Sequence, residues 1–430
     1  MRVMNIRFWL LVVVAALLTS GAAFGSGFSL FEQGAKATAM GGAFAATADD
    51  PSAIFYNVAG IAQIRRTEFN VGGTAINFSN QFTGDANDTF ASGSTGFYRR
   101  HTFVPPNAYV VVPIGSNLTF GIGAFTPYGL RTSWQDPWVG RFSSRDANIK
   151  VLSVEPALAW QTSDGRLAIG GGPEYRRAHV ILNRNIPSPS VNPFVGRLPD
   201  IANAYLASGW ESHWGWNVGI LYKPSNAFRI GASYRTDMTI DFKGNVTINQ
   251  IPTGSAQLDA LIKAQLPPSQ GVTTSIPFPA TLIVGVGTGV IPNWNIEADV
   301  TRTTWSRFKS LDVVFTQTPA ANISRPQNWK DTYSYRLGAN HPVTPRWDVR
   351  LGTVYDQNPQ PTEAVSPLLP DADRFGIAFG VGYHQGSWVI DATEFALRFN
   401  PRSTKGVSTD LNGQYKTSAN LISVNLGYRF

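Results

Sequence analysis

Histidine, serine and cysteine often carry catalysis or hold metals, but their spacing in this sequence supports neither. The 430 residues contain no cysteine, and the five histidines are scattered along the chain. These are His101, His179, His213, His341 and His384. Neither the His-Glu-x-x-His pattern of zinc hydrolases nor the Gly-x-Ser-x-Gly turn of lipases occurs. His179 is the one histidine worth testing for a phospholipase, so we expect no enzyme, no metal site and no cofactor.

A second pattern has the spacing needed to hold an apolar molecule. The loop expected at 244–276 contains an apolar stripe at helical spacing, and two prolines end it. The stripe consists of Leu258, Leu261, Ile262 and Leu266. The loop expected at 184–207 carries Phe194 among other apolar residues. Since a surface loop has no core of its own, the two loops either pack together or form an apolar groove, and these interpretations are compatible.

The composition excludes several classes of protein. Only 15% of the residues are charged and 12% are aromatic, whereas a disordered chain has few aromatic and many charged residues. Lysine and arginine number 35 against 28 acidic residues, but the longest basic run is 99–101. Such thinly spread charge argues against nucleic-acid binding. The chain is rich in glycine and is expected to be mostly β-structure.

The first 25 residues have the three parts of a signal peptide. Arg2 and Arg7 form a positive region, residues 8–18 an apolar run, and residues 23–25 a small-residue cleavage site. The apolar run is too short to span a bilayer as a helix. No later segment contains 18 consecutive apolar residues. We therefore expect a mature chain from Ser26 that is exported to the periplasm, the outer membrane or beyond.

Strict alternation of apolar with small or polar residues marks the strands. At the C-terminus, Ile422, Val424 and Leu426 alternate with Ser423 and Asn425. One apolar face and one polar face is the pattern of a barrel strand in lipid, although a soluble sandwich has the same period. The connections favour the barrel, because short turns and long loops alternate strictly along the chain. Fourteen strands are expected, at 66–79, 102–113, 117–127, 148–161, 166–183, 208–223, 227–243, 277–290, 294–305, 331–341, 346–356, 373–384, 387–400 and 417–430.

The sequence thus predicts an all-β fold, a 14-stranded antiparallel transmembrane β-barrel over 64–430. A barrel of this width holds an aqueous channel unless something fills it. Residues 26–63 are rich in small residues and also carry large apolar ones. We expect this segment to lie in the lumen as a hatch, or plug. The alternative is a flexible periplasmic tail, which would not need the apolar side chains.

Several short motifs in order resemble one family, the outer-membrane long-chain fatty acid transporter (FadL) family, which includes toluene-type hydrocarbon channels. The likeness covers nearly the whole mature chain. Its motifs are residues 27–30, 48–50, 56–60, 126–130, 138–141, 215–219, 234–235, 241–244, 329–331, 335–339 and 369–374. The family's Asn-Pro-Ala reads Asn57-Val58-Ala59 here, so any gating detail tied to that proline is in doubt.

The resemblance implies a monomeric channel in the outer membrane of a Gram-negative bacterium that takes up hydrophobic compounds by passive diffusion. Ligand would enter an outer groove, move to an inner site above the hatch and leave sideways at a kink in the third strand. In this chain the kink would lie within 117–127, with Gly121 and Gly123 as weak points, since glycine leaves no side chain to pack. Phe28 and the 57–59 motif would belong to the hatch.

The resemblance also bears on the ligand, which is expected to be a long-chain fatty acid or, alternatively, an aromatic hydrocarbon. A fatty acid needs a partner for its carboxylate, since an unpaired charge in an apolar pocket is costly. Matching positions suggest Arg177 and Lys330 for that role. The alternative is that both are rim cations that bind lipopolysaccharide phosphate, outer-membrane lipid and lipopolysaccharide being the expected surroundings. A general diffusion porin is the competing function, but the predicted plug argues against it.

Overall fold

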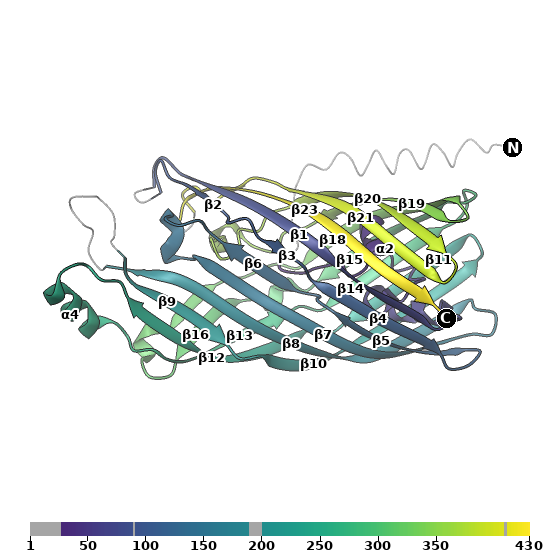
Figure 1. Ribbon diagram of the computed structural model, residues 1–430, viewed down its shortest axis with the longest axis horizontal. Helices are drawn as coiled ribbons and strands as arrows, with labels where there is room; N and C mark the ends of the chain where they lie inside the picture. Colours follow the sequence, from purple (N-terminus) through teal and green to yellow (C-terminus); the bar gives the residue numbers. More distant parts are fainter. Residues whose placement is uncertain (1–26, 89–90, 189–199, 408–410) are drawn as a thin grey trace.

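Fourteen long strands form a closed antiparallel barrel in the computed structural model, which describes residues 27–430 except 89–90, 189–199 and 408–410. Figure 1 shows the barrel on its side, with short turns and the C-terminus at one end and longer loops at the other. In ring order the strands are β1 (Glu68–Gly84), β4 (Pro106–Pro113), β5 (Leu118–Phe125), β7 (Asp146–Gln161), β8 (Leu167–Pro187), β10 (Glu211–Ser225), β11 (Phe228–Arg235), β14 (Thr281–Thr288), β15 (Asn295–Thr303), β18 (Thr332–Thr344), β19 (Trp347–Asp356), β20 (Arg374–Gln385), β21 (Trp388–Phe399) and β23 (Gly413–Arg429). Pairing of β23 with β1 closes the ring.

The alternation predicted from the sequence is confirmed in the strand faces. On β23, Ile422 and Val424 are about half exposed, whereas Ser423 and Asn425 are buried toward the lumen. Every backbone polar group in the hydrocarbon layer needs a partner, and only a closed sheet provides this for strands. The expected short turns are also confirmed, since they join β4 to β5, β7 to β8, β10 to β11, β14 to β15, β18 to β19 and β20 to β21.

The wall extends beyond the barrel at the long-loop end. β12 (Met238–Gln250) continues β11 after a break at residues 236–237, and β13 (Gln270–Phe278) precedes β14 after a break at 279–280. The prediction of single strands at 227–243 and 277–290 missed these breaks. It also treated β9 (Asp200–Ser208), β16 (Ser310–Phe315) and β17 (Ile323–Pro326) as loop, although they pair with β8, β12, β13 and each other. Shorter strands are β2 (Thr95–Phe97), β3 (Thr102–Phe103), β6 (Gly129–Ser133) and β22 (Arg402–Ser403).

The N-terminal segment, residues 27–64, is enclosed by the ring of strands. It contains α2 (Ala35–Ala39), α3 (Ala53–Tyr56) and the 3-10 helix η1 (Val58–Gln63). α2 contacts β19, β20, β21 and β23, whereas η1 contacts β5, β7, β8 and β10 on the other side of the ring. Figure 1 shows α2 within the barrel outline, near the end that carries the short turns.

Side chains of the wall hold this segment through its backbone. One carboxylate oxygen of Asp299 accepts hydrogen bonds from the backbone N–H of Phe44 and of Ala45, at 2.9 and 3.0 Å. The Asn217 side-chain amide donates to the carbonyl of Ile54 at 3.0 Å. A segment of small residues leaves many backbone groups to satisfy, and the polar lumen face of the barrel supplies the partners.

The remaining helix lies outside the barrel. α4 (Ala256–Gln265) begins after Ser255, whose hydroxyl accepts a hydrogen bond from the Leu258 N–H, and ends before two prolines. The helical spacing in this loop therefore predicted a helix correctly. Short 3-10 turns are η2 (Val139–Phe142), η3 (Trp305–Arg307), η4 (Pro319–Ala321) and η5 (Thr362–Ala364). Within the described ranges, every helix is too short or too polar to cross a bilayer.

Candidate functional site: a gap in the wall and three connected cavities

The barrel wall is interrupted beside the third strand of the ring. β4 and β5 pair up to Ala108 and Ala124, and an isolated bridge joins Tyr98 to Trp134 farther out. Between these two pairs, β6 is paired with β7, and no pairing joins it to β3 within the part of the chain that the structure describes. We call this interruption the wall gap.

The N-terminal segment lines the wall gap from inside. The backbone N–H of Leu30 donates to the carbonyl of Pro127 at 2.9 Å, and the Gly129 N–H donates to the carbonyl of Phe28 at 3.0 Å. These bonds satisfy backbone groups that the missing strand pairing would leave open. The edge of the wall at the gap is therefore made partly by a segment that is not part of the barrel.

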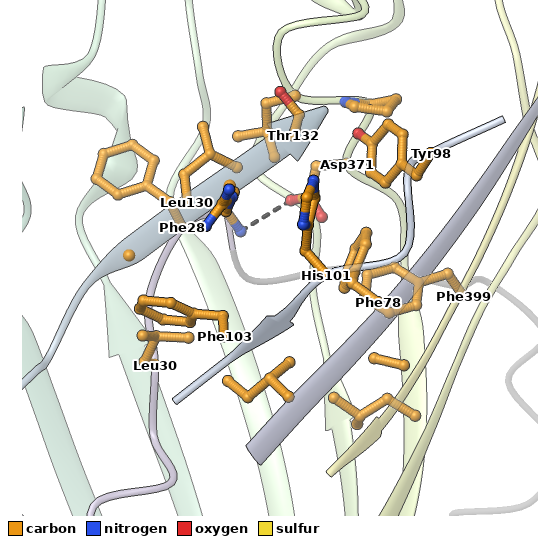
Figure 2. A pocket seen from close by; sticks show the side chains of 18 of the residues that line it. Phe28, Leu30, Phe78, Tyr98, His101, Phe103, Leu130, Thr132, Asp371 and Phe399 are labelled. Atoms are coloured by element: carbon orange, nitrogen blue, oxygen red, sulfur yellow. Dashed lines mark hydrogen bonds between the residues drawn. The ribbon is translucent and has the colours of Figure 1, made fainter. Parts of the chain in front are cut away.

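A cavity of about 110 Å³ opens beside the wall gap, and we call it the inner cavity. Figure 2 shows its apolar side chains, which come from the N-terminal segment, β1, β3, β6 and β21. They include Phe28, Leu30, Phe78, Phe103, Leu130 and Phe399. Its acidic, basic and histidine lining residues are Glu32, Arg99, His101, Arg131, Asp371 and Arg374. An apolar cavity with a few polar groups is typical of a site for small molecules.

Asp371 ties this cavity to the N-terminal segment. Its carboxylate accepts a hydrogen bond from the Gly27 N–H at 2.8 Å, drawn as the dashed line in Figure 2. Burial raises the pKa of Asp371 to about 7, and the positive charge of Arg374 opposes part of this shift. Arg374 itself pairs with Asp356 at 2.7 Å. The buried carboxyl therefore changes its charge close to neutral pH.

Arg99 and Arg131 are the cations of the inner cavity that are open to a ligand. Both side chains are exposed, and neither forms an ion pair with a carboxylate among the described residues. Guanidinium groups match carboxylates in geometry, because two parallel N–H groups can donate to the two oxygens. The inner cavity thus combines an apolar lining with two available positive charges.

Two further apolar cavities lead from the inner cavity toward the long-loop end. The middle cavity, of about 60 Å³, shares Phe28, Leu130 and Leu369 with the inner cavity. The outer groove, of about 250 Å³, shares another three residues with the middle cavity. These are Leu182, Leu311 and Leu368. The shared lining makes the three cavities neighbours in one apolar series.

Phe28 stands where the inner and middle cavities meet. Its ring centroid lies 4.7 Å from that of Trp305 and 6.0 Å from that of Trp329. Tyr128, Phe278 and Phe308 complete the aromatic surroundings, at centroid distances of 5.9 to 6.5 Å. Such edge-to-face contacts stabilise the position of the ring beyond its burial alone.

Neither of the predicted carboxylate partners, Arg177 and Lys330, lines any of these three cavities, and their role in binding a carboxylate stays a prediction. Arg177 is exposed on the outer face of β8, whereas the adjacent Arg176 is buried and pairs with Glu174 at 2.7 Å. Lys330 is likewise exposed, whereas Trp329 is buried beside Phe28. In a strand, successive side chains point to opposite faces, so a choice that is off by one residue exchanges lumen for lipid.

The predicted groove residues also lie elsewhere. Leu258 and Leu261 are about half exposed or more, Ile262 and Leu266 are half-buried, and none of the four lines the outer groove. Phe194 lies outside the described residues. The walls of the groove are instead side chains of β8, β9, β12, β16 and β17, including Leu182, Leu206, Val246, Val313 and Ile323. Sequence reasoning missed them because these strands were taken for loops.

The glycines expected to weaken the third strand are fully paired. Gly121 pairs with Val111 and Ala157, and Gly123 pairs with Tyr109 and Glu155. A Cβ atom on either glycine would approach Ile54 of the N-terminal segment to 2.9 and 3.1 Å. The glycines therefore make room for that segment, and the interruption of the wall begins only after Phe125.

The hatch residues expected at 57–59 lie in the lumen. Asn57, Val58 and Ala59 are buried, and the Asn57 side-chain amide donates to the carbonyls of Ala45 and Ile220 at 2.7 and 3.0 Å. Asn57 thus joins two turns of the N-terminal segment to β10. The role of this motif in gating, and the boundary at residue 63, stay predictions.

The sequence of this chain matches a family model described as "Outer membrane protein transport protein (OMPP1/FadL/TodX)" over residues 16–430. The chain belongs to this family. Its resemblance to the FadL family is thereby confirmed, together with the fold and the outer-membrane class that the resemblance implied. The family is one of transport proteins and not a class of enzymes.

Individual relatives are distant but extend over most of the chain. A long-chain fatty acid transport protein from Salmonella typhi is 26% identical over 392 residues, covering 86% of this chain and 87% of the relative. Outer membrane protein P1 of Haemophilus influenzae is 24% identical, covering 98% of each chain.

Solved structures share the fold of this family member. A Pseudomonas aeruginosa FadL homologue superposes with a TM-score of 0.81 at 21% identity, covering 94% of this chain and all of the other. The toluene transporter TodX of P. putida superposes with a TM-score of 0.74 at 18% identity, covering 95% and 99%. At sequence identities this low, the superpositions establish a shared fold and do not indicate a shared substrate.

Proposed function

We propose that this FadL-family protein is a passive channel that moves hydrophobic molecules from the outer groove through the middle and inner cavities to the wall gap. The observation that carries the proposal is the shared lining of the three cavities, which connects the long-loop end with an opening in the side of the barrel. Burying an acyl chain gains about 0.8 kcal/mol per methylene, so an apolar path needs no energy source.

The N-terminal segment serves in this proposal as the plug of the lumen. Its backbone is bonded to both sides of the ring, through Asn217 on β10 and through Thr393 on β21. A molecule in the inner cavity therefore meets a filled lumen on the periplasmic side and an interrupted wall at its flank. This arrangement supports lateral exit and argues against a water-filled porin.

Long-chain fatty acids are the proposed substrates, with aromatic hydrocarbons as the alternative. Arg99 and Arg131 supply positive charge beside an apolar lining, which suits a molecule with a carboxylate head and a hydrocarbon tail. The family relatives from Salmonella typhi and other enterobacteria are named for fatty acid transport, whereas several structural neighbours are toluene transporters. A neutral hydrocarbon would not need the two arginines.

The compound that co-purifies with the protein tests the substrate class. The protein is extracted from its native membrane, and bound small molecules are identified by mass spectrometry. Recovery of long-chain acids, depleted in an Arg99→Gln/Arg131→Gln variant, is expected. Recovery of aromatic hydrocarbons alone would favour the alternative. Passage of small sugars into liposomes at porin rates would contradict both.

A further inference from the structure

A lysine, an arginine and a histidine side chain lie together on the outer face of the barrel, and none of the three lines the inner cavity, the middle cavity or the outer groove. On neighbouring strands β7 and β8, Lys150 pairs with His179 and Leu152 pairs with Arg177. Because side chains alternate, Lys150, His179 and Arg177 share the outward face, while Ala178 between the last two is buried. Among the residues that the structure describes, no carboxylate forms an ion pair with Lys150 or Arg177.

An exposed tryptophan holds two of these side chains. The guanidinium carbon of Arg177 lies 5.6 Å from the centre of the Trp210 ring, and the His179 ring stacks on the same indole at 5.5 Å. Trp210 is 47% exposed. Contact with an aromatic face orients a guanidinium while its N–H groups stay free to donate. We call Lys150, Arg177, His179 and Trp210 the cationic patch.

Glu211 is the carboxylate on β10 whose strand pairing brings it nearest to the patch, but it does not neutralise the patch. Glu211 pairs with Ala178, so its side chain starts on the lumen side of the sheet. The residue opposite Arg177 is instead Ser212, which is exposed. The patch therefore keeps its positive charge and faces whatever surrounds the barrel.

The height of the patch places it at the outer edge of the apolar band. Arg177 follows the first residue of β8, Leu167, by ten positions. At about 3.3 Å per residue and a tilt of about 40°, this distance corresponds to about 25 Å along the barrel axis, the usual height of the lipid-facing band. Leu152 and Trp214 are exposed just below and beside the patch.

We propose that the cationic patch binds the phosphate groups of a phosphorylated glycolipid of the outer leaflet, the lipid A part of lipopolysaccharide. Lys150 and Arg177 donate to a phosphate at the level where such head groups lie, and exposed Leu152 and Trp214 contact the acyl chains below it. The positive charge of the patch favours an anionic lipid as its ligand. Because the patch lies outside the lumen, it is separate from the proposed transport path.

Binding of defined lipid A tests this proposal. The intact protein is placed in phosphatidylcholine nanodiscs, and its affinity is measured for diphosphoryl lipid A and for the dephosphorylated form. Lys150→Gln/Arg177→Gln is expected to bind diphosphoryl lipid A at least about tenfold more weakly than the wild type, because charged hydrogen bonds are lost. The dephosphorylated form is expected to bind both proteins equally weakly.

Arg166→Gln is the matched control. Arg166 is an exposed arginine in the turn that precedes β8, at the opposite end of the apolar band, where the leaflet contains no lipopolysaccharide. Its variant is expected to bind lipid A as the wild type does. Wild-type affinity in the Lys150/Arg177 double variant, or equal affinity of the wild type for the two lipids, would overturn the proposal. The Lys150/Arg177 double variant is expected to take up hydrophobic molecules as the wild type does, whether or not it binds lipid A. The lipid A measurement therefore tests the patch independently of the proposed transport function.

Discussion

At the scale of single residues, Asp371 joins three parts of the molecule. It belongs to the loop between β19 and β20, lines the inner cavity and accepts a hydrogen bond from Gly27. Below pH 7 its carboxyl is mostly protonated and neutral, and above pH 7 it is mostly charged, because burial raises its pKa to about 7. An anion in the same cavity is then repelled only at the higher pH.

Anionic ligands are therefore expected to bind less tightly as the pH rises from about 6 to about 8. The expected loss is about 1 kcal/mol, or about fivefold in affinity. An alkyl sulfonate is the suitable probe for calorimetry, since its own charge is constant over this range. Asp371→Asn keeps an acceptor for Gly27 and is expected to reduce the pH dependence, while Asp373, whose pKa burial also raises to about 7, still titrates. A wild-type affinity that does not change with pH would refute this role.

Arg99 and Arg131 are expected to select for a carboxylate. Arg99→Gln/Arg131→Gln should weaken fatty acid binding about tenfold while leaving the binding of a neutral alkane of the same length unchanged. Arg177→Ala/Lys330→Ala, in contrast, should leave both affinities unchanged, because neither side chain lines the three cavities. The same fluorescence titration applied to both variants distinguishes the two pairs of cations, and the opposite pattern would restore the original assignment.

The difference between Arg176 and Arg177 shows what the sequence could predict about single residues. Ile169 and Tyr175 lie on the same face of β8 as Arg177, so alternation alone indicated that Arg177 points outward. The family resemblance, in contrast, points to Arg177 as a carboxylate partner, which this alternation does not support. Asp371 belongs to the family motif at 369–374. Its hydrogen bond with Gly27, however, joins residues that are 344 positions apart, and no local sequence pattern predicts such a contact.

At the scale of elements, the N-terminal segment depends on the wall for its backbone hydrogen bonds. Asp299 on β15 is buried and accepts from both Phe44 and Ala45. The small residues of α2 let it approach β20 and β21 closely. The segment thus combines polar anchoring to the lumen face with an apolar cluster that packs Phe44, Ile54 and Phe55 against wall residues such as Tyr109 and Phe125.

Removal of this acceptor is expected to loosen the N-terminal segment while the barrel stays intact. Asp299→Ala leaves two buried N–H groups without a partner, at a cost of about 1–3 kcal/mol each. Channel conductance in a planar bilayer should rise, and a protease should cleave within 27–64. Thr301→Ala is the control, since Thr301 lies on the same face of β15 and its buried hydroxyl has no hydrogen-bond partner among the residues that the structure describes. Equal conductance in the two variants would contradict the anchoring role.

The strands of the ring could be predicted because lipid imposes a strict two-residue period on them. The extensions β9, β12, β13, β16 and β17 lie at the long-loop end, where this constraint ends, and so local periodicity did not indicate the side chains that line the outer groove. The wall gap depends on which strands fail to pair around Thr126–Tyr128. Which strands pair with each other depends on contacts between residues far apart in the sequence, and the local periodicity of a strand does not predict them.

At the scale of the whole molecule, the account depends on one series of apolar spaces. The outer groove lies between strands beyond the ring, the middle cavity lies at Phe28, and the inner cavity lies at the wall gap. Leu369 lines both the inner and the middle cavity, so a molecule that crosses from one to the other passes this side chain. The middle cavity has the smallest volume of the three.

The most direct measurement of this path is the uptake of radiolabelled oleate by cells that carry Leu369→Trp. The indole is expected to fill the junction and to reduce uptake at least tenfold, at unchanged protein level and unchanged heat-modifiable mobility. Leu337→Trp, on the lipid-facing side of β18, is the control and should take up oleate as the wild type does. Wild-type uptake by Leu369→Trp would show that hydrophobic molecules do not travel through the connected cavities.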